Sequence, residues 1–177
     1  YRKKIMMNQN ARRVIRVTPT ITGVQYSNND VLFDTTEVPL AVGKPGECSK
    51  LVSAMVSSKS NSLVDMELFF CTVNQSVGTV NSARSVSDSD WATAKVLGRL
   101  TLDSSADNYN YGNGRIHNFD RQSETYSTTD QWKSRFPILL QAAAGSTSIY
   151  TFAFVTGTDV TPEFSVGDLE LVLGVEY

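Results

Sequence analysis

Histidine is the scarcest reactive residue in this chain of 177 residues, which contains one histidine and two cysteines. A Ser-His-Asp or Cys-His arrangement would have to use His117, because the chain has no other imidazole. His117 lies in a strand-like segment after a turn, where a hydrogen-bonded polar side chain is the commoner role. A zinc site would need a second histidine or closely spaced cysteines. We therefore predict no enzyme, no bound metal and no cofactor.

The two cysteines, Cys48 and Cys71, are too few to make a disulfide scaffold. Cys71 follows Phe69 and Phe70 in an apolar run, so we predict that it is a buried free thiol. A disulfide between Cys48 and Cys71 is the alternative, and it requires that their two strands lie side by side.

Long apolar runs are also missing. No stretch approaches the roughly 20 apolar residues of a membrane-spanning helix, and the N-terminus lacks the pattern of a secretory signal. Charged residues make up 19% of the chain, below the globular average of about 25%, and Ser, Thr and Asn replace them. We expect no membrane association and a single domain over residues 17–177.

Positive charge is concentrated at the N-terminus, although the formal net charge is −2. Six basic residues precede Asp30, the first acidic residue: Arg2, Lys3, Lys4, Arg12, Arg13 and Arg16. We predict that residues 1–16 form a basic arm that docks on a negative surface, such as another protein or a neighbouring copy. Nucleic acid is not expected as a partner, because aromatic residues are not interleaved with these charges beyond Tyr1. A solvated tail is the alternative.

Short apolar runs bounded by Gly, Asn, Ser and Pro recur along the whole chain, as in an all-β fold. The pattern predicts a single antiparallel β-sandwich, jelly-roll-like, with one short helix and an extended N-terminal arm. The expected strands include residues 13–18 at a sheet edge, 31–33, 48–57, 64–73, 96–102, 115–119, 138–140, 149–155 and 169–173. A tight turn is expected at Asn113-Gly114.

Two pairs of carboxylates have structural explanations. Asp88 and Asp90 follow Ser87 at the start of the expected helix, where acidic side chains favour the helix N-terminus. Asp65 and Glu67 alternate with apolar residues, which predicts that they lie on the solvent side of a half-buried strand.

The candidate site residues are those expected at a protein interface, where Arg, Tyr and Trp are enriched. Arg12, Arg13 and Arg16 are expected to supply charge contacts from the arm. Tyr109 and Tyr111 lie in the least regular region, residues 107–131, and long loops in compact domains often have functional roles. The candidate anchors are Tyr109, Tyr111, Trp132 and Phe136, and ordinary packing is the alternative for each of them.

Several segments resemble a group of small structural proteins of tailed bacteriophages. The resemblance rests on strand-and-turn patterning in residues 17–20, 26–33, 64–70, 139–150 and 169–175. It implies a head decoration (cement) protein, made in the host cytoplasm, that binds the major capsid protein on the outer surface of the shell and stabilises it. Because such clamps associate symmetrically around a shell axis, we expect a homo-trimer.

Other functional classes are compatible with the same residues. One is a glycan-binding, tail or baseplate module of the virion, since sandwiches often carry sugar sites built from exposed Tyr and Trp. Another is a small hydrolase with an unfamiliar site, which would have to depend on His117.

Overall fold

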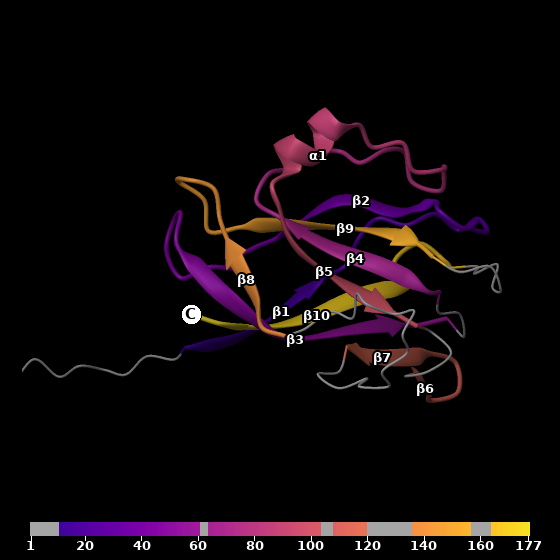
Figure 1. Cartoon of the computed structure of the whole chain (residues 1–177). Coiled ribbons are helices and arrows are strands. Elements are labelled where there is room, and N and C mark those ends of the chain that lie inside the picture. Colours follow the sequence, from indigo (N-terminus) through magenta and orange to yellow (C-terminus); the bar gives the residue numbers. More distant parts are fainter. Residues whose placement is uncertain (1–10, 61–63, 104–107, 120–135, 157–163) are drawn as a thin grey trace, which may run out of the picture.

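We analysed a computed structural model, which describes residues 11–60, 64–103, 108–119, 136–156 and 164–177. Within these residues the chain forms strands and one short helix (Figure 1). In chain order the elements are β1 (Arg12–Val17), β2 (Val31–Val38), β3 (Cys48–Ser58), β4 (Met66–Cys71), α1 (Asp88–Ala94), β5 (Val96–Leu102), β6 (Asn108–Asn110), β7 (Arg115–Phe119), β8 (Ile138–Gln141), β9 (Ile149–Val155) and β10 (Leu169–Glu176).

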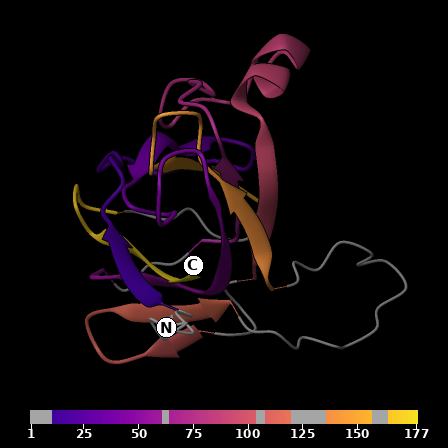
Figure 2. The same cartoon turned by 90° about the vertical axis from the view of Figure 1, so that its left-hand side faces the viewer.

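The strands form two antiparallel sheets that pack face to face, which confirms the predicted all-β sandwich. The large sheet has the order β1-β10-β3-β7-β6, with β8 also paired to β3, and the small sheet has the order β2-β9-β4-β5. With β1-β10-β3-β7 in one sheet and β2-β9-β4-β5 in the other, this strand order is that of a jelly roll. Figure 2 shows the molecule from the side, with α1 outside the small sheet and the β6–β7 hairpin at one edge of the large sheet.

The strands β7 and β8 occupy one position in the large sheet. β7 pairs with residues 54–58 of β3, and β8 pairs with residues 48–51 of the same strand. The expected strand after the Asn113-Gly114 turn is confirmed as β7, and the turn joins it to β6.

Alternating burial along the strands builds the core between the sheets. In β10, Leu169, Leu171 and Leu173 are buried, while the intervening residues are half-buried on the opposite face. A strand points successive side chains to opposite faces, so this alternation places every second residue of β10 in the core. The small sheet supplies Phe70 and Leu100 to the same cluster, and both are fully buried.

The segment that joins β4 to β5, residues 72–95, covers much of the outer face of the small sheet. Val77 and Ala94 from this segment pack on Phe69 and Phe152 in a second apolar cluster. α1 lies within this segment and is capped as predicted: the Ser87 hydroxyl accepts a hydrogen bond from the Asp90 N–H. The small sheet is therefore buried on both faces over part of its area.

Cys71 lies in this second cluster, and burial raises the pKa of its thiol to about 12. The prediction of a buried free thiol is confirmed, and Cys48 is a free, exposed cysteine. Cys48 lies on β3 of the large sheet and Cys71 on β4 of the small one, so their strands are not neighbours.

This difference between the two thiols can be measured. We expect a thiol-specific reagent near pH 8 to modify Cys48 in the folded protein, and Cys71 only after unfolding in denaturant, because the reactive species is the exposed thiolate. Mass spectrometry of peptides after timed labelling would locate the modified residue. Equal labelling rates for both thiols in the folded protein would contradict the described packing of Cys71, and a Cys48→Ser variant serves as the control.

Candidate interaction surfaces

The three predicted arginines lie in a strand and not in an arm. β1 pairs with β10 at the edge of the large sheet, so the expected boundary between residues 16 and 17 falls inside β1. The edge-strand prediction is confirmed. The remaining arm, residues 1–10, lies outside the described residues, as do its basic residues Arg2, Lys3 and Lys4.

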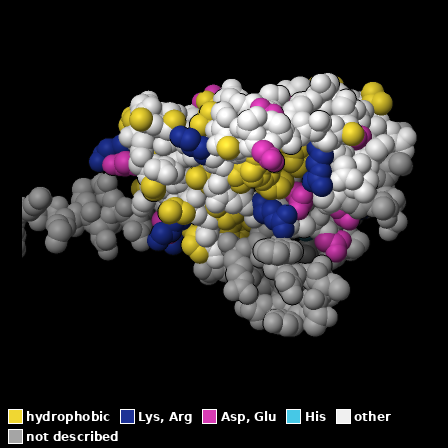
Figure 3. Space-filling model, turned by 45° about the horizontal axis from the view of Figure 1, so that its top comes forward, with side chains coloured by type: hydrophobic (Ala, Val, Ile, Leu, Met, Phe, Trp, Pro, Cys, Tyr) yellow, Lys and Arg dark blue, Asp and Glu magenta, His cyan; other side chains and the backbone are white. Residues whose placement is uncertain are grey.

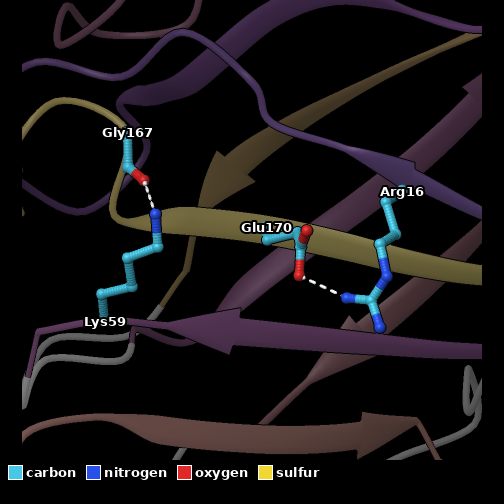
Figure 4. Close-up of polar contacts among 4 residues, drawn as sticks. All are labelled: Arg16, Lys59, Gly167 and Glu170. Atoms are coloured by element: carbon cyan, nitrogen blue, oxygen red, sulfur yellow. Dashed lines mark hydrogen bonds and ion pairs between the residues drawn. The ribbon is translucent and has the colours of Figure 1, made fainter.

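Two of these arginines form ion pairs within the sheet. Arg12 Nε lies 3.0 Å from Glu176 Oε2, and Arg16 Nη1 lies 2.7 Å from Glu170 Oε2. Figure 4 shows the second pair, in which the Arg16 guanidinium on β1 reaches across to the carboxylate on β10. Their charges are thus partly balanced inside this molecule. For Arg13 the structure gives no ion pair with another described residue.

The same close-up shows how the adjoining turn is held. The Lys59 ammonium, at the end of β3, donates a hydrogen bond of 3.3 Å to the Gly167 carbonyl (Figure 4). The Lys59 N–H also donates to the Asp168 carbonyl at 2.9 Å. These two hydrogen bonds fix the turn that precedes β10 to the residue that follows β3.

A hollow lies on this outer face where β10 lacks a side chain. Gly174 pairs with Val14 on one side and with Ser53 on the other, and a β-bulge follows it. A Cβ at position 174 would occupy the space of the Ser53 hydroxyl, so a side chain here would require that hydroxyl to rotate away. The hollow has a volume of about 250 Å³, and we call it the Gly174 hollow; it is lined by Arg12, Arg13, Val14, Val52, Ser53, Gly174 and Val175.

The Gly174 hollow combines an apolar wall with a basic rim. Val14 is 65% exposed although it is a large apolar residue on a strand. Val52 is half-buried beside the bulge, and Arg12 and Arg13 stand at the edge. A hollow of this kind suits an apolar side chain of a partner with an acidic neighbour, the arrangement typical of interface hot spots.

The three aromatic candidates that lie within the described residues are not brought together into one site. Tyr109 is 69% exposed and pairs with Ile116 on the outer face of the large sheet. The Tyr111 hydroxyl donates to the Ser58 carbonyl at 3.1 Å, which holds this ring against the end of β3. Phe136 is buried in the core cluster, so the alternative of ordinary packing is the correct one for this residue. Trp132 lies outside the described residues.

Glu67 alternates with the buried residues Met66 and Leu68, as predicted, but two arginines cover most of its side chain. Its carboxylate lies 2.5 Å from Arg99 Nη1 and 3.6 Å from Arg84 Nη1, and its side chain is only 17% exposed. Asp65 precedes β4 and is not part of the strand.

A second hollow opens beside Glu67 on the outer face of the small sheet. Its walls are Trp91 of α1 and residues 84–86, its floor is Phe69 and Phe154, and its volume is about 330 Å³. We call it the Trp91 hollow. Figure 3 shows hydrophobic side chains gathered on this side of the molecule, with basic and acidic side chains next to them. Sequence patterns did not indicate it, because its residues come from three separate segments.

The described residues offer little for metal or acid–base chemistry. They contain no group of three or more His, Cys, Asp or Glu positioned to hold a metal ion. His117 is buried in β7 with its ring 5.1 Å from that of Phe119, in an edge-to-face arrangement.

The described residues contain no helix that is long and apolar enough to cross a membrane.

Comparisons with known proteins give no family: no protein-family model matches the chain, and neither does any curated protein or solved structure.

The ion pair of Arg16 is exposed, so it should add little to stability. We expect Arg16→Gln to change the free energy of unfolding by less than about 1 kcal/mol, since solvent screens a pair whose side chains are 61% and 32% exposed. Phe70→Ala, in the core, should lower it by about 3–5 kcal/mol. Urea unfolding of the three proteins measures both values. A loss above about 2 kcal/mol for Arg16→Gln would instead make this pair a main attachment of β1.

Proposed function

We propose that this chain is a non-catalytic structural protein of a bacteriophage virion, a decoration protein that binds the outer surface of the head shell. The observation that carries the proposal is the Gly174 hollow, an apolar socket with a basic rim on the outer face of the large sheet. The resemblance of the strand-and-turn segments to phage structural proteins supports the same class. Jelly rolls occur in viral capsid proteins, lectins and cupins, so the fold alone does not distinguish these functions.

The partner proposed for this face is the major capsid protein. The Gly174 hollow takes an apolar side chain against Val14 and Val52, and the arginines that line it, Arg12 and Arg13, favour an acidic residue next to that side chain. Arg12 is paired with Glu176, so it adds less free charge to the rim than Arg13, and Arg16, which does not line the hollow, is paired with Glu170.

Shell stabilisation follows from binding that requires the assembled state. A protein that binds the shell and not the separate subunits shifts the equilibrium toward the shell. Three copies arranged around a shell axis would place three such hollows on the surface at once, which raises the apparent affinity by multivalency. Residues 1–10, which continue from the β1 edge, are proposed to extend the contact to capsid protein.

The test uses two variants that differ only in position. Val14→Asp and Val24→Asp place a charge at apolar residues that are 65% and 62% exposed, so both should fold. Head shells assembled from the major capsid protein of the encoding phage would be mixed with each protein and sedimented. We expect wild type and Val24→Asp to bind, and Val14→Asp to bind at least about tenfold more weakly, because the charge would be buried in the hollow.

The outcomes separate the parts of the proposal. If the wild-type protein does not sediment with shells and does not raise their melting temperature, the decoration function is wrong. If it binds but Val14→Asp binds equally well, the function stands and the Gly174 hollow is not the contact. Sedimentation equilibrium of the free protein tests the trimer.

A further inference from the structure

The Trp91 hollow lies on the sheet opposite to the Gly174 hollow, so proposed shell binding leaves it without a role. It is lined by Phe69, Arg84, Ser85, Val86, Trp91 and Phe154. Its volume of about 330 Å³ falls at the lower end of the range for small-molecule pockets, about 300–1,000 Å³. A hollow of this volume can hold a single small ring. It is too small to be a protein–protein interface by itself, because each partner in a standard interface buries about 800 Å² of surface.

Aromatic rings make the hollow rigid and apolar. Phe69 stacks on Phe152 at 5.1 Å, and it meets Phe154 at 5.7 Å and Trp91 at 5.3 Å edge to face. Phe69 and Phe154 are 6% and 2% exposed, whereas Trp91 is 40% exposed. The buried rings therefore hold the indole in place while much of it remains open to a ligand.

Among the described residues, the one charged residue that lines the Trp91 hollow is Arg84. Glu67 is shared by Arg99, at 2.5 Å, and Arg84, at 3.6 Å. The second distance is too long for a hydrogen bond, so Arg84 can donate to a ligand without losing one to Glu67. The Arg84 guanidinium carbon lies 5.5 Å from the Phe154 ring centroid, and its side chain is 44% exposed. Arg84 is thus oriented over the aromatic floor.

We propose that the Trp91 hollow binds a sugar ring that carries a carboxylate, as in a uronic acid. The C–H face of a pyranose is apolar and packs on an aromatic ring, while its rim carries hydroxyl groups that accept and donate hydrogen bonds. Arg84 forms a charge-assisted pair with the ligand carboxylate, and Ser85, which also lines the hollow, supplies a hydroxyl for the ring hydroxyls. The chain would thereby attach to acidic polysaccharide through the small sheet, independently of the face proposed for the shell.

The experiment compares two probes and two matched arginine variants. Binding of D-glucuronate and of D-glucose to the full chain would be followed by saturation-transfer NMR and by titration. Both arginines are exposed and ion-paired, Arg84 in the Trp91 hollow and Arg16 on the large sheet, so Arg84→Gln and Arg16→Gln form a matched pair. We expect wild type and Arg16→Gln to bind glucuronate about tenfold more tightly than glucose, and Arg84→Gln to lose this preference.

Trp91→Ala tests the stacking surface, and it should weaken the binding of both sugars at least about tenfold. Circular dichroism would verify that this variant is folded, and Trp91→Phe, which keeps an aromatic ring, should restore part of the binding. Two results would overturn the proposal: no binding of either sugar by the wild type, or an unchanged glucuronate preference in Arg84→Gln. A change in the NMR signals of Trp91 on addition of N-acetyl-phenylalaninamide, with no change on addition of either sugar, would also overturn the proposal. It would indicate that the hollow binds an aromatic side chain of a protein instead.

Discussion

Burial of alternate side chains between the two sheets is the constraint on which the other features depend. β10 lies between β1 and β3, and its leucines point into the core. Because side chains on a strand alternate, this burial obliges Val172, Gly174 and the two glutamates to point outward. Val14 of β1 is exposed for the same reason, since it pairs with Gly174. The register of one central strand thus decides which residues a partner can reach.

The two sheets differ in how far other residues cover their outer faces. Residues 72–95 fold over the small sheet and give it a second apolar cluster, in which Cys71 keeps its proton up to high pH. The covering segment contacts only part of the face, so Trp91 and Arg84 border an opening over Phe69. The large sheet has an exposed row with a missing side chain at Gly174. The two outer faces of the sandwich are therefore unlike in shape and chemistry.

Local patterns predicted most of the strands and the helix. The alternation in residues 169–173 and the Ser87 cap each depend on neighbours within a few residues, so they were readable directly. The environment of Glu67 was not, because Arg99 and Arg84 approach it from other segments. Phe136 and Tyr111 show the same limit: one is in the core and the other is held by the Ser58 carbonyl. The residues next to Phe136 and Tyr111 in the sequence do not predict either contact.

By itself, the sequence determined the fold class, the capped helix and the burial of Cys71, since periodicity and short-range hydrogen bonding are encoded in adjacent residues. Only the tertiary structure decided that this edge strand pairs with β10, which places Arg12 beside Glu176 and Arg16 beside Glu170. It also brought Trp91 next to Phe69 and Phe154, and Val14 next to Gly174. The physical reason is that surfaces arise from strand register and sheet packing, which join residues far apart in the chain.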